Sequence, residues 1–327
     1  MASARKAEPK WDGSARVRAH AKVNLGLRVL APRPDGFHNL CTVFQTVGLH
    51  DDVSVSVRSG TDRGIRLHCD REDLNHPGNL AWRAADQLLR RMQADALVRI
   101  GLRKRIPSGA GLGGGSSDAA AVLRALGILL SPRPPDQVLK EVAGDIGSDV
   151  PYFLLGGTAA GTGRGTLLAP LPELGPRPIA LALPDIEVPT AWAYRALDQA
   201  RAMKLTSTGR SNKLNSVRSE PAPSRGPACN DFPERMTNDF ESVVFDRFPA
   251  LGEIKREILS LGARQALLSG SGSAVFGMFD SFHSASQAAS RIAASGIRAE
   301  AVRFVSRSDA ERSASVRRAA AKAGCDD

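Results

Sequence analysis

Aromatic residues are scarce in this 327-residue chain: phenylalanine, tryptophan and tyrosine together make up 5%, with only two tyrosines. The chain nevertheless has a formal net charge of +10. Proteins that bind nucleic acid usually place basic side chains among aromatic ones on a folded face, where bases can stack. The composition therefore argues against nucleic acid as a partner. A basic nucleic-acid-binding protein stays as an alternative, which would show strongly salt-dependent binding.

Long apolar runs, cysteine pairs and metal-ligand spacing are also missing. No run approaches the roughly 18 apolar residues of a membrane span, and residues 1–18 do not resemble a signal peptide. The four cysteines are scattered without a C-x-x-C pair, and the six histidines show no metal spacing. We therefore predict a cytoplasmic protein with no membrane partner, no disulfide framework and no zinc site.

The excess positive charge lies in two polar stretches. Residues 201–227 hold six basic residues and one acidic residue, and residues 1–18 hold five basic and two acidic residues. Both stretches are poor in apolar residues, which is typical of segments outside a packed core. We therefore expect flexible tails at 1–16 and 307–327, the latter with a frayed helix, and a flexible insertion near 203–233.

Glycine, by contrast, is concentrated in residues 107–121, which read PSGAGLGGGSSDAAA. Glycines let the backbone approach a ligand closely and turn successive N–H groups in one direction. The alanines that follow predict a helix, which Ser116, Ser117 or Asp118 could cap. Backbone N–H groups at a helix N-terminus form a site for anions, above all phosphate. We therefore predict that this segment binds a nucleotide or another phosphate ester.

Two better-known glycine loops fit this segment less well. A P-loop ends in Gly-Lys-Ser/Thr, but no lysine lies between Pro107 and Arg124. Gly109, Gly111 and Gly114 match the letters of a dinucleotide fingerprint, which should however follow a strand that opens its domain. Here the loop lies a third of the way along the chain. A glycine-rich surface turn without a ligand is the remaining alternative.

Strand-like and helix-like segments are mixed without strict alternation. The patterns predict strands at 17–29, 41–57, 98–102, 179–183 and 299–305, and helices at 79–92, 116–130, 135–143, 241–261 and 284–294. Residues 156–165 predict a loop or a tight hairpin. An apolar fraction of 42% supports a packed core. This mixture favours the α+β class over a doubly wound sheet, with a domain boundary near 171–177.

Three segments resemble the GHMP kinases: the glycine loop, residues 21–25 (AKVNL) and residues 268–273 (LSGSGS), in that order. Further segments are similar to the branch of the family whose substrate carries a cytidine diphosphate group. These are residues 34–40 (PDGFHNL), 147–153 (GSDVPYF), 161–165 (GTGRG) and 238–241 (NDFE). The resemblance spans about residues 17–305 and departs in the basic N-terminal extension, the insertion and the tail.

The resemblance implies a two-domain GHMP kinase fold, with a ribosomal S5-like N-terminal domain at 17–172 and a ferredoxin-like C-terminal domain at 177–306. It implies a small-molecule kinase that uses ATP and Mg²⁺ to phosphorylate an alcohol group in isoprenoid (terpenoid) biosynthesis. The substrate would bear a cytidine diphosphate group, and the enzyme would be a monomer or homodimer. Another GHMP kinase, acting on mevalonate, homoserine or a sugar, is the alternative.

The resemblance makes Asp149 the catalytic base, since phosphoryl transfer requires a group that orients the acceptor hydroxyl and accepts its proton. It places Lys22 beside this base. The residues alone also allow Asp149 to cap a short helix beginning at Val150, and Lys22 to be an exposed strand lysine. Asn24 lies on the same strand face as Lys22 and is expected to contact the substrate.

For ATP, the resemblance implies that the glycine loop wraps the phosphates through its N–H groups, with Asn79 near the adenine. A serine hydroxyl of the loop would help hold Mg²⁺, but the metal ligands are not assigned. The expected ATP-binding residues are Pro107, Gly109, Ala110, Gly111, Leu112, Gly113, Gly114, Gly115, Ser116, Ser117 and Asn79.

At the other end of the site, the resemblance implies that Phe37 and Tyr194 sandwich the cytosine while His38 hydrogen-bonds its edge. Stacking of this kind contributes about 1–3 kcal/mol per base. Ser269 and Gly270 are expected to cover the phosphates or the acceptor. Each assignment has a structural alternative: a lone histidine is more often structural, and Tyr194 also fits the core side of a helix.

Overall fold

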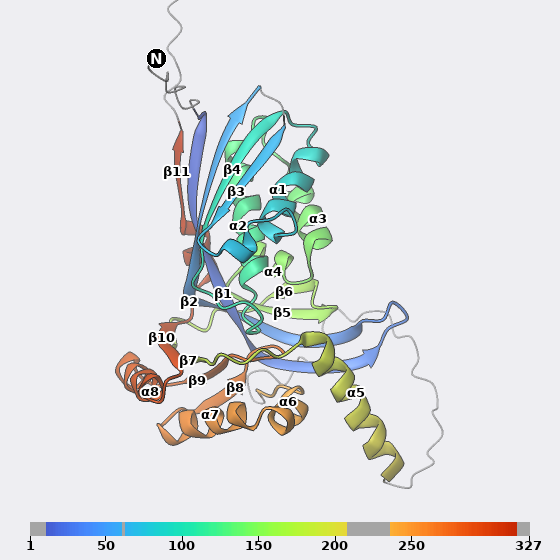
Figure 1. The fold of residues 1–327 in the computed structure, drawn as a ribbon, viewed down its shortest axis with the longest axis vertical. Helices are drawn as coiled ribbons and strands as arrows, with labels where there is room; N and C mark the ends of the chain where they lie inside the picture. The colour runs from blue at the N-terminus through green and yellow to red at the C-terminus, as the bar shows by residue number, and fades with distance from the viewer. Residues whose placement is uncertain (1–10, 61–62, 208–235, 319–327) are drawn as a thin grey trace, which may run out of the picture.

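The computed structural model describes residues 11–60, 63–207 and 236–318 (Figure 1). The first ten residues, most of the expected insertion at 203–233 and the last nine residues therefore lie outside the described part of the chain. Two sheets with helices packed against them make up the rest, so the predicted α+β class is confirmed.

The larger sheet has seven strands in the order β11-β1-β2-β4-β3, with β5 paired to β2 and β6. Its long central pair is β1 (Gly13–Pro32) and β2 (His38–Ser59). The other strands are β3 (Gly64–Cys69), β4 (Ala96–Arg103), β5 (Thr158–Gly163), β6 (Leu167–Pro170) and β11 (Ala314–Arg318). One face is covered by α1 (Leu80–Arg91), α2 (Gly114–Leu129), α3 (Asp136–Ile146) and α4 (Val150–Leu155) (Figure 1).

The smaller sheet has four strands in the order β10-β7-β9-β8. They are β7 (Pro178–Leu183), β8 (Gln265–Leu268), β9 (Val275–Met278) and β10 (Arg298–Arg303). Two helices, α7 (Pro249–Ser260) and α8 (Phe282–Ala294), pack on one face of this sheet. Residues on the other face pack with β1 and β2 in a core cluster of their own. The helices α5 (Thr190–Ser207) and α6 (Glu241–Arg247) lie beside it.

Strand β1 takes part in every one of these cores. Its residues Ala15, Val17 and Ala19 pack under the helices of the larger sheet. Residues 21–25 contribute to the cluster between the sheets, and residues 27–29 to the cluster under α7 and α8. The register of β1 on β2 shifts between His20 and Lys22. Such irregularities re-aim the side chains that follow them, and the predicted site begins at this point.

Several expectations need correction. The predicted helix at 241–261 is two helices, because Pro249 lacks the N–H needed to continue α6. The hairpin predicted as one alternative for residues 156–165 is confirmed, since β5 and β6 pair antiparallel around a turn at residues 164–166. The sequence patterns missed β3, β6, β8, β9 and β11, and they gave no range for α5. Helix α2 begins at Gly114 after Gly113, whose φ is 72°, so Ser116, Ser117 and Asp118 are not its cap.

The tails also differ from expectation. Residues 13–16 belong to β1, and α9 (Arg307–Arg312) is followed by β11, which pairs antiparallel with β1 from Gly13 to Val17. The flexible tails predicted at 1–16 and 307–327 are therefore wrong for these residues. Cys41 on β2 is disulfide-bonded, although no disulfide framework was expected. Cys69 is a buried free thiol.

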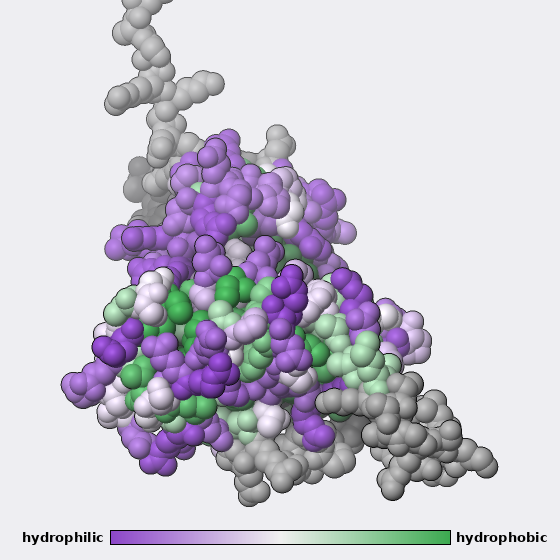
Figure 2. Space-filling model, turned by 60° about the horizontal axis from the view of Figure 1, so that its bottom comes forward, coloured by the Kyte–Doolittle hydropathy of each residue, from purple (hydrophilic) through white to green (hydrophobic). Residues whose placement is uncertain are grey.

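Nothing in the described ranges forms a helix long and apolar enough to cross a membrane. Figure 2 shows the end of the molecule to which the smaller sheet belongs. Hydrophobic residues are interspersed there with hydrophilic ones, whereas the part behind is mostly hydrophilic. Scattered apolar residues of this kind are ordinary on a protein surface.

Candidate active site

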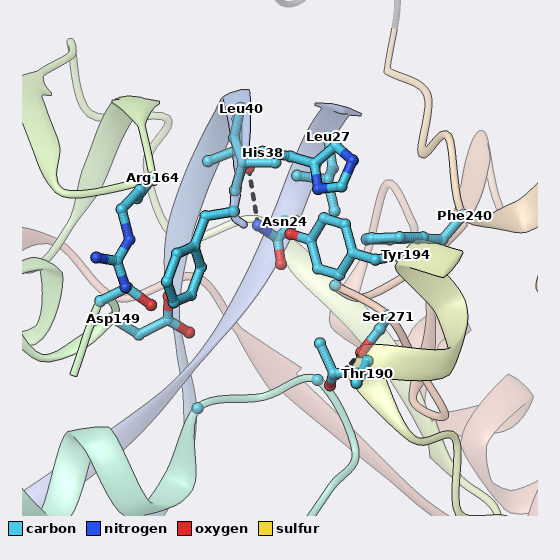
Figure 3. A pocket seen from close by; sticks show the side chains of 18 of the residues that line it. Asn24, Leu27, His38, Leu40, Asp149, Arg164, Thr190, Tyr194, Phe240 and Ser271 are labelled. Carbon is cyan, nitrogen blue, oxygen red and sulfur yellow. Dashed lines mark hydrogen bonds between the residues drawn. The ribbon is translucent and has the colours of Figure 1, made fainter. Parts of the chain in front are cut away.

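A pocket of about 690 Å³ lies between the two sheets (Figure 3). Its wall combines segments far apart in the sequence: β1, β2, the glycine loop, the start of α4, the β5–β6 turn, α5 and the loop after β8. Asp149 and Arg164 lie on one side of the pocket, and His38 and Tyr194 on the other (Figure 3). A concave site of this size accommodates a nucleotide-sized ligand.

Lys22 is buried in the pocket wall, with 4% of its surface exposed. Its Nζ donates to Asn24 Oδ1 at 2.6 Å, and Asn24 Nδ2 donates to Thr42 Oγ1 at 2.8 Å. Burial lowers the pKa of Lys22, while the nearby Asp149 acts in the opposite direction. Lys22 is therefore not an exposed strand lysine. Asn24 lines the pocket, and both ends of its amide are engaged, one with Lys22 and the other with Thr42.

Asp149 directly precedes α4, at the position of its N-cap, yet its side chain makes no capping hydrogen bond. In the part of the chain that the structure describes, its carboxylate has neither a hydrogen bond nor an ion pair. It lines the pocket with Lys22, and its charge raises the pKa of that lysine. The fold thus brings together two residues that the sequence could not pair. The capping role left open for Asp149 does not occur.

The two glycine loops pack against each other. The carbonyl groups of Ala110, Gly111 and Leu112 accept hydrogen bonds from the Ala274 N–H, the Ser269 hydroxyl and the Lys22 N–H. At Gly111, where φ is 74°, a Cβ atom would lie 2.0 Å from the Ser269 carbonyl oxygen. Glycine is therefore required for this approach.

With these carbonyl groups turned to the protein, the N–H groups of residues 109–116 have no hydrogen-bond partner among the described residues. A run of unpaired N–H groups ahead of a helix is the feature predicted for a phosphate site. Gly111 and Gly113 line the pocket directly. The other predicted members of the ATP site lie outside that lining: Pro107, Gly109, Ala110, Leu112, Gly114, Gly115, Ser116, Ser117 and Asn79.

Two of the residues predicted to bind ATP have their polar groups engaged elsewhere. Ser117 is buried, its hydroxyl donates to the His20 carbonyl at 2.7 Å, and its N–H bonds to Gly113. Asn79 caps α1, since its Oδ1 accepts from the Ala81 N–H at 2.9 Å. Both side chains therefore hold the backbone around the loop rather than offering a free group to a ligand.

A buried ion network supports the glycine loop from behind. Lys104 Nζ donates to Asp51 Oδ2 and Asp118 Oδ2, each at 2.5 Å. Asp118 lies on α2, and Asp51 Oδ1 accepts from the Ile106 N–H at 2.9 Å. Burial raises the pKa of Asp118 to about 7, although Lys104 opposes this shift. The network thus joins β2, the end of β4 and the helix after the loop.

At the other end of the pocket, the ring of His38 stacks on that of Tyr194, with centroids 5.0 Å apart. His38 Nε2 lies 3.0 Å from Asp198 Oδ1. Tyr194 also meets Phe240 edge-on at 4.8 Å, so it is both a pocket residue and a partly buried core residue. Phe37 is 49% exposed, and the Arg164 guanidinium lies 3.5 Å from its ring centroid.

The loop after β8 is held by side chains of the 238–241 segment. Asn238 Nδ2 donates to the carbonyl groups of Leu268 and Gly270, at 2.8 and 2.7 Å. Gly270 lines the pocket, whereas the hydroxyl of Ser269 is turned to Gly111. Ser271, bonded to Thr190 at 2.9 Å, lines the pocket in its place.

Several lining residues were not predicted. They are Leu27, Gly36, Leu40, Thr42, Phe44, Ser148, Arg164, Gly165, Thr190, Ala191, Arg195, Asp198, Phe240 and Ser271. Arg164 lies within the noted GTGRG segment, which was the one available signal for it. Six more lie within segments noted for the resemblance: Gly36, Leu40, Ser148, Gly165, Phe240 and Ser271. The remaining residues reach the pocket only through tertiary packing.

Comparisons with known proteins find relatives along most of the chain. Residues 79–157 match the GHMP kinases N terminal domain, and residues 227–298 match the GHMP kinases C terminal domain. The chain is 45% identical over 265 residues to 4-diphosphocytidyl-2-C-methyl-D-erythritol kinase of Solibacter usitatus, covering 81% of each. It is 39% identical to the protein of that name in Geobacter sulfurreducens, covering 88% of this chain and 98% of the relative.

Solved structures show the same relationship. A crystal structure of 4-(cytidine 5'-diphospho)-2C-methyl-D-erythritol kinase matches with a TM-score of 0.69 and 37% identity, covering 88% of this chain and 98% of that one. Homoserine kinase from Cytophaga hutchinsonii matches with a TM-score of 0.65 at 18% identity, covering 95% and 99%. The second likeness concerns the fold alone.

Proposed function

Since the chain belongs to the GHMP kinase family, and its relatives at 38–45% identity are 4-diphosphocytidyl-2-C-methyl-D-erythritol kinases, we propose that it carries out their reaction. It transfers the γ-phosphoryl group of ATP to the 2-hydroxyl of that cytidyl compound in the non-mevalonate isoprenoid pathway. The observation that carries this proposal is the meeting of Lys22 and Asp149 in one pocket with the glycine loop at one end and aromatic rings at the other.

In the proposed reaction, the substrate oxygen forms a bond to the γ-phosphorus while the bond from that phosphorus to the β–γ bridging oxygen breaks. Asp149 accepts the hydroxyl proton, and ADP leaves. The Asp149 carboxylate suits this step because it has no hydrogen-bond or ion-pair partner among the described residues and is free to accept the proton. Lys22, fixed by Asn24, supplies a positive charge beside the reacting oxygen. Positioning and electrostatics of this kind account for most of the catalysis in phosphoryl transfer.

The glycine loop is proposed to bind the ATP phosphates through the N–H groups of residues 109–116. The residues fit a Mg²⁺ ion that arrives with ATP, because Mg²⁺ in kinases is held mainly by phosphates, waters and one or two protein oxygens. Ser116, whose hydroxyl has no described protein partner, would hold it at the start of α2. When bound, the ion neutralises charge on the phosphates.

The cytosine is proposed to enter between Phe37 and Tyr194, with His38 at its edge. Phe37 contacts Arg164 on one side of the pocket, and Tyr194 lies on the other side (Figure 3). Both rings line the same pocket, which supports the placement of a base between them. The contact of His38 with Tyr194 would have to adjust when a base stacks on the tyrosine.

The test is a coupled ADP-release assay with Mg²⁺-ATP and purified protein. We expect turnover with 4-diphosphocytidyl-2-C-methyl-D-erythritol and none above background with mevalonate or homoserine. Phosphorylation of mevalonate or homoserine without activity on the cytidyl compound would overturn the proposal. No observation favours this alternative, since the homoserine and mevalonate kinases are 12–18% identical and share the fold alone.

A further inference from the structure

Arg164 lies at the tip of the tight turn between β5 and β6. Its neighbours Gly163 and Gly165 have φ values of 64° and 87°, a conformation that favours glycine. Gly163 pairs with Leu40 on β2, so the turn lies beside the start of β2, where Phe37 and His38 are found. The backbone thus presents Arg164 to the pocket at a fixed place.

The guanidinium group of Arg164 contacts an aromatic ring but has no salt-bridge partner among the described residues, although Asp35 lies near enough to interact with its charge. The guanidinium lies 3.5 Å from the centroid of the Phe37 ring. Within the described ranges it makes no hydrogen bond and no ion pair, so its N–H donors remain available. Two other charged side chains of the wall are engaged: Lys22 bonds to Asn24, and Asp198 is paired with His38.

We infer that Arg164 binds the diphosphate bridge of the acceptor substrate. This inference rests on the proposed function. A cytidyl substrate has its base at one end, its hydroxyl at the other and a diphosphate between them. The base end is at Phe37 and the reacting end is at Asp149; Arg164 contacts Phe37 and lines the same side of the pocket as Asp149 (Figure 3).

Guanidinium chemistry suits this role. Its planar fork of donors matches two phosphate oxygens at once, which a lysine ammonium cannot reproduce. Stacking on Phe37 fixes the plane of the fork before the ligand arrives, so less conformational freedom is lost on binding. Arg164 covers one face of the ring and leaves the opposite face for the base. Arg195 also lines the pocket, but no described contact fixes its side chain.

The experiment compares Arg164→Gln and Arg164→Lys with the wild-type protein in the ADP-release assay. Arg164→Gln should raise KM for the cytidyl substrate roughly 10- to 100-fold, as expected for loss of hydrogen bonds to a charged group. KM for ATP and kcat should change by less than about threefold. Arg164→Lys should give an intermediate KM. Arg66→Gln is the control for loss of one charge, because Arg66 is exposed on β3, away from the pocket.

Comparing inhibition by cytidine with inhibition by cytidine diphosphate separates the contact with the phosphates from the contacts with the nucleoside. Arg164→Gln should weaken inhibition by the diphosphate and leave that by the nucleoside unchanged. Equal weakening of both, an unchanged KM, or a larger effect of Arg195→Gln would overturn the assignment to Arg164. If the wild-type protein does not phosphorylate the cytidyl compound, the proposed function fails instead, so the two failures are distinguishable.

Discussion

Asp149 shows how one residue position can fit two roles that only the structure separates. It precedes α4, where aspartate and asparagine cap a helix about equally well, but its carboxylate faces the pocket and makes no cap hydrogen bond. Asp149→Asn keeps the shape and removes the basicity. We expect kcat to fall about 10²- to 10⁴-fold while ATP still binds, as measured by steady-state kinetics and nucleotide titration.

Lys22 provides the matched comparison for that prediction. Lys22→Ala should also lower kcat, and the double variant should lose less than the two single losses combined, because both residues act on one oxygen. Near-normal turnover of Asp149→Asn would contradict the catalytic role. A fall in turnover accompanied by unfolding would contradict it as well, since the asparagine would then have disturbed the fold.

His20 makes stability depend on pH. Burial, together with the adjacent His50, lowers the pKa of His20 from 6.5 to about 4; Arg18 and Arg124 act in the same direction, and its hydrogen bond to Val47 opposes them. The unfolded chain therefore binds a proton at this residue between these values while the folded chain does not. The free energy of unfolding should decrease as pH falls from about 6.5 to 4, by on the order of 3 kcal/mol.

Urea unfolding at several pH values between 7.5 and 4 measures this dependence. His20→Gln should flatten it, whereas His283→Gln should not, because His283 is exposed on α8. The same slope in His20→Gln and wild-type protein would show that other groups cause the acid sensitivity.

At the scale of elements, the Lys104 network joins α2 to the sheet. Lys104→Met leaves Asp51 and Asp118 buried without their cation, and breaking a buried pair in this way typically costs about 3–5 kcal/mol. We expect a loss of that size in urea unfolding, partly recovered by adding Asp118→Asn. Lys140→Met, on an exposed position of α3, is the control. Equal stabilities of the two methionine variants would contradict a structural role for the network.

The C-terminal strand β11 closes the edge of β1. A chain ending at Ser306 loses this pairing and the hydrogen bonds of Arg307 to Thr158 and of Arg124 to Ala310. We expect the free energy of unfolding to fall by about 2–4 kcal/mol, with kcat at low temperature nearly unchanged because none of these groups lines the pocket. A chain ending at Arg318 keeps β11 and should match the full chain in thermal unfolding; equal loss in both would contradict the prediction.

Some of these elements could be predicted from the sequence and others could not. The apolar stripes of α1 and α8 and the alternation in β2 predicted those elements correctly, because each pattern records local burial. Helix α5 has no single apolar stripe. Strand β11 is short and basic, so its sequence carries no strand pattern, and it forms by pairing with the edge of β1. In the site, local motifs pointed to Lys22, the glycine loops and Asp149. The contact of His38 with Asp198, 160 residues away, has no local pattern.

At the scale of the whole molecule, the boundary expected near 171–177 falls between β6, a strand of the larger sheet, and β7, the first strand of the smaller sheet. We propose that the two sheets are two domains divided there, with α9 and β11 returning to the first. A ligand in the pocket contacts both. Cytidine diphosphate should therefore stabilise the molecule as one unit.

Differential scanning calorimetry tests this expectation. At a concentration of about 100 times its Kd, the nucleotide should add about 2.7 kcal/mol to stability and shift a single transition upward. Uridine diphosphate is the control for the diphosphate alone and should shift it less. No shift with the cytidine nucleotide, or a shift of only one of two separate transitions, would contradict the prediction.

Strand β1 runs through all three core clusters and carries Lys22 near its middle. Lys22 therefore lies on a strand whose two ends are both packed in hydrophobic cores, and not on a domain joined to the rest by a flexible linker. A hinge motion that opens the pocket would have to bend β1 and disturb all three cores at once. Ligands must instead enter and leave through small movements of side chains and turns around β1. The position of Lys22 relative to Asp149 then stays the same from one turnover to the next.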